Sequence, residues 1–167
     1  RCRLLGIDDD PAEAAPRVGY ERKGETLTDG FQLDTVGAGD MRRHRVDACL
    51  VPSADPHLSE YLPEHWQARS WLSGFTGSAG TLVVALEWAG LWTDSRYFAQ
   101  AERELAGSGI ELMRQRATSV PEHLEWLRQQ LAPGQLLAVA GDSLPLATRA
   151  RIERQFESTG ARLRTDL

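Results

Sequence analysis

The fold is decided by residues 71–93, which read WLSGFTGSAGTLVVALEWAGLWT. Within them, residues 81–86 contain a Leu-Val-Val run of β-prone side chains, and this run predicts a buried strand. Residues 87–89 can turn the chain back into residues 90–93. The sequence therefore predicts a β-hairpin at this point.

The residues in front of the hairpin predict a strand, a helix and a turn. Residues 46–52 form an apolar run that ends in a proline and has the length of a buried strand. Residues 63–72 have a helical composition, and Gly74 follows them at a position where glycine often closes a helix. The glycines of residues 76–80 then allow the backbone to bend between this helix and the hairpin.

The residues behind the hairpin continue the alternation of strands and helices. We expect helices at residues 96–106, 120–131 and 145–158, and strands at residues 110–114, 136–140 and 161–164. Candidate N-caps for these helices are Asp94 or Ser95, Ser119 with Glu122 as a capping box, and Ser143. This order predicts an α/β fold in which a mixed β-sheet is flanked by helices.

The opening residues differ from the rest of the chain. Scattered glycines and the lack of a sustained period of 2 or 3.6 lead us to interpret residues 1–40 as irregular and residues 41–167 as the folded domain. Any helix in this segment is expected to be interrupted at Gly37 and Gly39, because each interior glycine costs a helix about 1 kcal/mol relative to alanine. Since the chain begins with Arg1, we expect a processed, tagged or fragmentary chain.

Composition and charge exclude several classes of protein. The 167 residues carry 19 basic and 24 acidic side chains, for a net charge of -5, so nucleic acid is not an expected partner. No stretch approaches the roughly 18 apolar residues that span a bilayer, and the start lacks the layout of a secretory signal, so no membrane contact is expected. Cys49 lies in an apolar run and is expected to be a buried thiol. We expect a soluble, intracellular protein.

The sequence contains no self-contained catalytic constellation. His57, Asp94 and Ser78 are the residue types of a hydrolytic triad, but the glycine that a nucleophile elbow needs two residues before the serine is missing. Asp55, His57 and His65 lack the further ligand that a metal site needs. We therefore expect a structural turn at Ser78 and solvated histidines.

Aromatic side chains are concentrated in one stretch of the chain. They are Trp66, Trp71, Phe75, Trp88, Trp92, Tyr97 and Phe98. The first interpretation is a core packed around them, because tryptophan buries a large area wherever it lies. The second is a partly exposed aromatic wall that receives a ligand or partner, with Arg96 and His57 at its rim.

Three segments carry a resemblance to a known family. Residues 51–61, 71–81 and 91–98 closely resemble, in this order, the first domain of three-domain Xaa-Pro aminopeptidases (aminopeptidase P). The resemblance extends from Met41 to Leu167. It implies a creatinase-type N-terminal domain, a mixed sheet flanked by helices that is related in fold to ribonuclease H.

The resemblance also implies a function and its location. In that family a C-terminal domain with two divalent metals, usually manganese, hydrolyses the bond before a penultimate proline, so this chain alone is expected to be inactive and free of cofactors. The N-terminal domain shapes the substrate cleft and takes part in subunit contacts of a cytoplasmic homo-oligomer. By this likeness His57, Phe75, Arg96 and Tyr97 are the candidates to face the cleft. The expected partners are the remaining domains and a peptide with proline at its second position.

A function of a different class stays open at this point. The chain could be a free-standing peptide-binding or assembly module that uses its aromatic surface and has no hydrolase activity.

Overall fold

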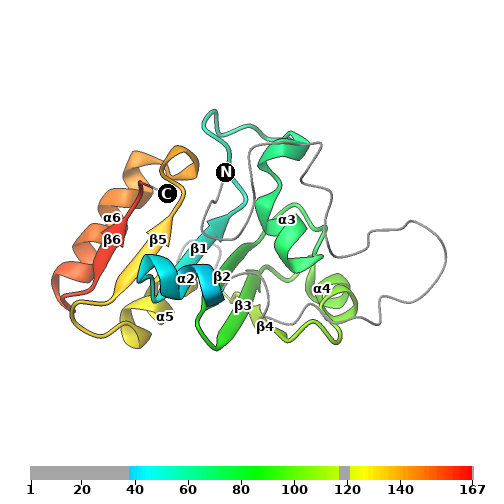
Figure 1. Cartoon of the computed structure of the whole chain (residues 1–167). Helices are drawn as coiled ribbons and strands as arrows, with labels where there is room; N and C mark the ends of the chain where they lie inside the picture. Colours follow the sequence, from blue (N-terminus) through cyan, green and yellow to red (C-terminus); the bar gives the residue numbers. More distant parts are fainter. Residues whose placement is uncertain (1–37, 117–120, 167) are drawn as a thin grey trace.

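A six-stranded sheet runs through the middle of the molecule between two layers of helices (Figure 1). The computed structural model describes residues 38–116 and 121–166. The strands are β1 Ala48–Pro52, β2 Thr81–Ala85, β3 Trp88–Thr93, β4 Ile110–Arg114, β5 Leu136–Val139 and β6 Arg162–Arg164. Their order in the sheet is β4-β3-β2-β1-β5-β6.

Among the described strands, only β2 runs antiparallel to its neighbours. It pairs antiparallel with β1 and β3, whereas the β1–β5, β3–β4 and β5–β6 pairs are parallel. The other five described strands therefore end on the same side of the sheet, where β2 begins. We call this side, marked by Pro52, Thr81, Thr93, Arg114 and Val139, the carboxyl edge.

The helices lie on both faces of the sheet. They are α2 Ala38–His44, the 3-10 turn η2 Glu64–Trp66, α3 Ala68–Ser73, α4 Phe98–Glu104, α5 Glu122–Gln130, the 3-10 turn η3 Gly141–Ser143 and α6 Leu146–Glu157. Helices α2, α3 and α4 pack on one face, and α5 and α6 pack on the other.

The sheet buries both of its faces because its strands alternate between two hydrophobic clusters. In β1, Cys49 and Val51 belong to the cluster under α2, α3 and α4, while Ala48 and Leu50 belong to the cluster under α5 and α6. A fully buried leucine or valine contributes about 1.5–3 kcal/mol relative to an exposed one. Burial on both faces therefore fixes the register, since a slip by one residue would exchange the two clusters.

The predicted hairpin is confirmed. Strands β2 and β3 pair from Thr81 opposite Trp92 to Ala85 opposite Trp88. The other predicted strands also form, each within two residues of the expected bounds. The fold class, a mixed sheet flanked by helices, is confirmed, and Cys49 is buried as predicted.

The predicted helix starts are less accurate than the strands. The helix expected at residues 63–72 is divided into η2 and α3, and α3 ends at Gly74, which has a left-handed φ of 69°. The N-cap predicted at Asp94 or Ser95 is wrong, because α4 starts after Tyr97 and the Asp94 carboxylate binds Arg96 instead.

The predicted cap at Ser143 is also wrong. Ser143 lies inside η3, and Pro145 takes the N-cap position of α6 without a side-chain hydrogen bond. Ser119 lies outside the described residues, and α5 begins at Glu122, after Pro121.

The irregular segment predicted at residues 1–40 lies outside the described residues except for its last three. These three belong to α2, which contains Gly39, so the expected interruption of the helix is wrong for residues 38–44. Met41 explains how a short helix can form there, because its side chain is fully buried in the core. Within the described residues, no helix has the length and apolar character that crossing a membrane requires.

Candidate functional site

Three loops meet at the carboxyl edge of the sheet. Residues 53–60 follow β1, residues 75–80 precede β2, and residues 94–97 follow β3. The strand register places these loops side by side, because Pro52 lies opposite Thr81 and Thr81 lies opposite Trp92. In sheets of this kind, ligands bind in the crevice outside the carboxyl ends of the strands.

A buried arginine organises two of these loops. Arg69, on α3, is 5% exposed. Its Nε donates to Ser53 Oγ at 2.6 Å, its Nη1 to the carbonyl of Phe75 at 2.9 Å and its Nη2 to the carbonyl of Gly77 at 2.6 Å. Ser53 Oγ in turn donates to the carbonyl of Gly80 at 2.8 Å. One guanidinium therefore holds the loop after β1 against the turn before β2.

Neutral groups in contact with the Arg69 guanidinium stabilise its positive charge. Burial lowers the pKa of Arg69 to about 10 from its usual 12.5, and attraction to the Glu104 carboxylate opposes this decrease in part. The guanidinium also lies over the ring of Phe75, 5.0 Å from its centroid. Carbonyl dipoles and the ring thus stabilise a cation that is almost fully removed from water.

The turn before β2 packs closely against aromatic rings. Phe75 is fully buried and meets Tyr97 edge to face at 5.9 Å. A Cβ at Gly77 would overlap the Phe75 ring and come within 2.8 Å of Tyr97 Cδ1. Glycine is therefore required at this position for steric reasons.

Tyr97 links the turn to the loop after β3. Its hydroxyl and Ser78 Oγ are 2.6 Å apart and share a hydrogen bond in which either can be the donor. Arg96 lies over the Tyr97 ring, 5.3 Å from its centroid. These contacts fix the orientation of a phenol at the carboxyl edge.

Arg96 is held in place by a two-pronged ion pair. Its Nε and Nη2 donate to the two carboxylate oxygens of Asp94, at 2.9 and 2.7 Å, and its backbone N–H donates to Asp94 Oδ1 at 3.0 Å. These hydrogen bonds from Arg96 lower the pKa of the Asp94 carboxyl below its usual value. The Arg96 side chain is 69% exposed, so it presents a positive charge to solvent in a defined orientation.

The outer end of the turn is anchored to α4. Glu104 accepts hydrogen bonds from the Thr76 backbone N–H and hydroxyl, both at 2.9 Å, and from Gln100 at 3.0 Å. Burial alone would raise the pKa of Glu104, but these hydrogen bonds lower it overall.

The loop after β1 is built around a buried carboxylate. Asp55 is 1% exposed, and its Oδ1 accepts the backbone N–H groups of Ser59 at 2.9 Å and His57 at 3.0 Å. The hydrogen bond from Ser59, followed by that from His57, holds the pKa of Asp55 below its usual value. The tight loop exposes His57 and Leu58, and Leu58 adopts a positive φ of 54°.

The structure brings three of the four predicted site residues together. Phe75, Tyr97 and Arg96 form one contact series, in which Phe75 meets the Tyr97 ring edge to face and Arg96 lies over that ring. His57 is exposed on the neighbouring loop, and no contact among the described residues joins it to the other three.

The residues of the possible triad bind other partners. Ser78 pairs with Tyr97, and Asp94 pairs with Arg96. The described residues also contain no group of three or more His, Cys, Asp or Glu side chains that could hold a metal ion.

Arg69 and Asp55 are the residues of the candidate site whose structural roles sequence reasoning missed. One signal was present for Arg69, because it is three residues from Leu72 and therefore shares the buried side of α3. No signal was present for Asp55, because its role depends on the local path of the loop around it.

The aromatic concentration is divided between two places. Trp88, Trp92 and Trp126 pack on the other face of the sheet, with Trp88 and Trp126 stacked at 4.3 Å and Trp92 buried beneath them. The ring centroids of His123 and Trp92 are 6.2 Å apart in an edge-to-face contact. The His123 Nδ1 is buried without a hydrogen-bond partner in the described part of the chain. The core interpretation thus holds for Phe75 and Trp92, whereas the side chain of Trp71 is 41% exposed.

Fold and sequence together define the class of the protein. The chain belongs to the Creatinase/Prolidase N-terminal domain family, whose sequence model matches residues 39–163.

Particular relatives confirm the resemblance to Xaa-Pro aminopeptidases. Aminopeptidase P2 of Arabidopsis thaliana is 52% identical over 89 residues, which are 53% of this chain and 12% of that protein. The crystal structure of X-prolyl aminopeptidase from Caenorhabditis elegans, described as a cytosolic enzyme with a di-nuclear active site, matches with a TM-score of 0.66 and 31% identity over 72% of this chain and 20% of that one.

A structure of a single domain shows the same fold. The N-terminal domain of the cytoplasmic peptidase PepQ from Mycobacterium tuberculosis matches with a TM-score of 0.57 and 21% identity, over 77% of this chain and 87% of that one. In contrast, the chain spans only 12% to 20% of the length of the curated relatives.

Proposed function

We propose that this chain is the N-terminal domain of an Xaa-Pro aminopeptidase and that its carboxyl edge forms one wall of the substrate cleft. The observation that carries the proposal is the convergence of the three loops at this edge, where Arg69 and Asp55 hold the loop after β1 and the turn before β2, and the Ser78–Tyr97 hydrogen bond joins the loop after β3 to that turn. A wall with a fixed shape can position a peptide for chemistry that other residues perform.

The path of the chain supports this location of the cleft. Strand β6 ends on the same side of the sheet as the three loops, and the Thr165 carbonyl then lies against Gly141. The described chain therefore leaves the sheet at the carboxyl edge. Domains that continue from this point would lie next to the three loops.

Each candidate side chain has a role that its environment permits. Arg96 offers an exposed guanidinium that can bind a carboxylate or carbonyl of a peptide, and Tyr97 offers a hydroxyl at a fixed position. His57 is exposed on the loop after β1, at the same carboxyl edge, and would border the cleft there. Phe75, which is buried, acts as a support for Tyr97.

The metal chemistry belongs to the rest of the proposed protein. The described residues do not fit a site for two metals, because no group of three potential ligands occurs among them. We place two divalent metals, with manganese as the expected ion, in the catalytic domain that follows. We further propose a cytoplasmic homo-oligomer that acts on peptides with proline at the second position.

A second candidate is a free-standing module that binds a peptide or assembles with a subunit. It is favoured by exposed apolar side chains near the carboxyl edge, since Leu58 is 64% exposed and Tyr61 is 83% exposed. A partner that covers these side chains would bury apolar area at little cost.

Two assays test the proposal and separate it from the second candidate. The 167-residue chain mixed with manganese and an Xaa-Pro peptide should give no hydrolysis. The longer protein, meaning the proposed aminopeptidase that contains this domain together with its catalytic domain, should hydrolyse the peptide. Turnover by the chain alone would disprove the proposal that another domain performs the hydrolysis. Calorimetry with the same peptide and the chain alone should give no heat, whereas micromolar affinity would favour the free-standing module.

A further inference from the structure

Strand β4 is one of the two outer strands of the described sheet, and its outward backbone groups can be identified. The Gln115 backbone N–H donates to the Thr93 carbonyl at 2.9 Å, and Thr93 lies opposite Arg114 in the parallel pair. In a parallel ladder this pattern turns the backbone groups of Met113 and Gln115 toward β3. The N–H and C=O groups of Leu112 and Arg114 therefore point away from the sheet.

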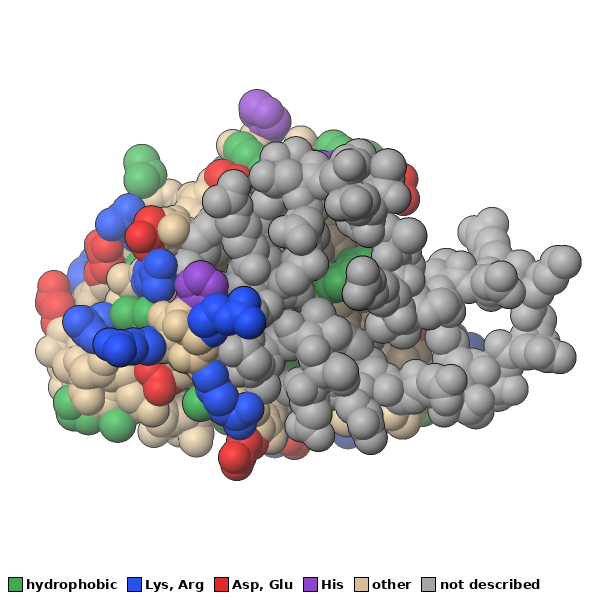
Figure 2. Space-filling view, viewed as in Figure 1, with side chains coloured by type: hydrophobic (Ala, Val, Ile, Leu, Met, Phe, Trp, Pro, Cys, Tyr) green, Lys and Arg blue, Asp and Glu red, His purple; other side chains and the backbone are tan. Residues whose placement is uncertain are grey.

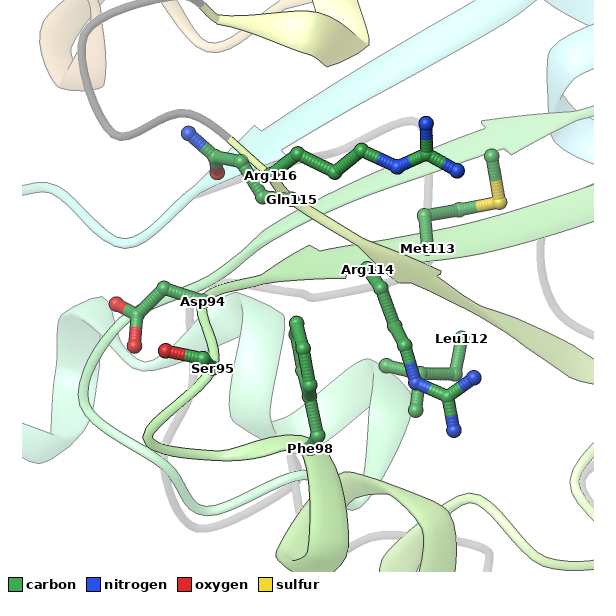
Figure 3. A pocket seen from close by; sticks show the side chains of 8 residues that line it. All are labelled: Asp94, Ser95, Phe98, Leu112, Met113, Arg114, Gln115 and Arg116. Atoms are coloured by element: carbon green, nitrogen blue, oxygen red, sulfur yellow. The ribbon is translucent and has the colours of Figure 1, made fainter.

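A groove follows this outer strand. It has a volume of about 630 Å³ and is lined by residues 112–116, which are the end of β4 and the two residues after it, together with Asp94, Ser95 and Phe98. Figure 3 shows Phe98, Leu112 and Arg114 on one side of β4 and Met113 and Arg116 on the other. A groove that has side chains on both faces and backbone donors and acceptors along its floor has the form that an added strand requires.

The charges at the groove favour an acidic occupant, because two arginines line it and its one lining carboxylate, Asp94, is paired with Arg96. Arg114 is 56% exposed and stacks over the Phe98 ring at 5.6 Å, and its ion pair with Glu102 is exposed and therefore weak enough to exchange. Arg116 adds a second guanidinium on the opposite face. Apolar contacts with Phe98 and Met113 can accommodate the branched side chains of a strand.

We propose that β4 binds an extended peptide segment carrying carboxylate side chains, which adds to the sheet as a further strand through the backbone of Leu112 and Arg114. The Arg116 N–H is already bonded to Glu122 Oε1 at 2.9 Å, so the added strand ends there. This site uses none of the four cleft residues and does not depend on the function proposed above.

The test uses hydrogen exchange of the 167-residue chain with a synthetic probe, acetyl-Thr-Val-Asp-Val-Thr-amide. The probe has no proline and no free amino terminus, so it is not a ligand for the proposed cleft. Saturation with the probe should slow exchange of the Leu112 and Arg114 amides at least tenfold and leave those of Met113 and Gln115 unchanged. Absence of binding, or binding without protection of Leu112 and Arg114, would overturn the proposal.

A pair of variants isolates the backbone contribution. Arg114→Pro removes an outward N–H without removing a bond to β3, which proline tolerates at a sheet edge. Its matched control, Arg114→Ala, removes the same side chain and keeps the N–H. The proline variant should bind the probe at least tenfold more weakly than the alanine variant, and equal affinities would contradict strand addition.

A change in the probe avoids any effect on folding. Two probes methylated on alternate backbone nitrogens should differ in affinity at least tenfold, because only one set of amides faces β4 in an added strand. Equal binding of the two probes would also contradict the proposal.

Discussion

Gly77 shows how one residue without a side chain fixes the shape of the candidate cleft. The Phe75 and Tyr97 rings occupy the space where its Cβ would lie, so both rings can approach the backbone of the turn. Tyr97 gains its fixed orientation from this approach and from its hydrogen bond with Ser78.

We predict that Gly77→Ala costs about 2–4 kcal/mol of unfolding free energy, because the added methyl group forces at least one ring out of a packed position. Gly74→Ala is the matched control. Gly74 has open space around it and a left-handed φ of 69°, so alanine there should cost only about 1 kcal/mol. Urea denaturation measures both values, and equal losses would contradict the steric argument.

His123 gives the fold a dependence on pH. Burial lowers its pKa to about 4 from the usual 6.5, so the folded chain binds fewer protons than the unfolded chain between these values. The contribution of neutral His123 to the free energy of unfolding is fully present above pH 6.5. It should fall by roughly 2–3 kcal/mol as the pH decreases toward 4.

The measurement is the urea midpoint of wild type and His123→Gln between pH 7 and 4.5. His123→Gln should remove most of the change in urea midpoint with pH in this window. His65→Gln, a substitution at an exposed histidine, should leave this change as in wild type. Equal slopes in wild type and His123→Gln would show that other groups cause the dependence.

At the scale of elements, the conformation of the turn depends on Arg69. Its guanidinium satisfies the carbonyls of Phe75 and Gly77 and the hydroxyl of Ser53, which belong to two different loops. Helix α3 therefore positions this side chain while it also buries Leu72 in the core. Lysine has the same charge, but it lacks the planar fork that reaches these three acceptors together.

We predict that Arg69→Met lowers the unfolding free energy by about 2–4 kcal/mol, since it leaves buried carbonyls without a donor. Arg69→Lys should recover less than half of this loss. Arg151→Met, at an exposed position of α6, is the control and should change stability by less than about 0.5 kcal/mol. A loss at Arg69 as small as that at Arg151 would contradict the role of the network.

The strands were more predictable than the loops and caps for a physical reason. Strands such as residues 81–85 are apolar runs that end at polar or glycine-rich residues, and burial on both faces makes the run itself the signal. Helix caps depend on local hydrogen bonds, and Asp94 has a stronger partner in Arg96 than in the first turn of α4. Arg96 and Tyr97 are predicted site residues that follow from the family resemblance, whereas the hydrogen bonds of Arg69 to two loops depend on the three-dimensional arrangement of those loops.

At the scale of the whole molecule, the direction of the strands explains where a function can lie. Five described strands end at the carboxyl edge, so their loops gather on one side, and the described chain leaves the sheet there. The opposite ends of the strands carry the tight hairpin between β2 and β3. The carboxyl edge thus combines loops, exposed side chains and the point at which the described chain leaves the sheet.

The most direct test of the cleft is the kinetics of the longer protein with an Xaa-Pro peptide. Arg96→Ala should lower kcat/KM at least tenfold, mainly through a higher KM, because the exposed guanidinium is proposed to contact the peptide. Arg151→Ala, on α6 and away from the three loops, should leave kcat/KM unchanged. If both variants retain wild-type kcat/KM, the carboxyl edge of this domain is not a wall of the substrate cleft.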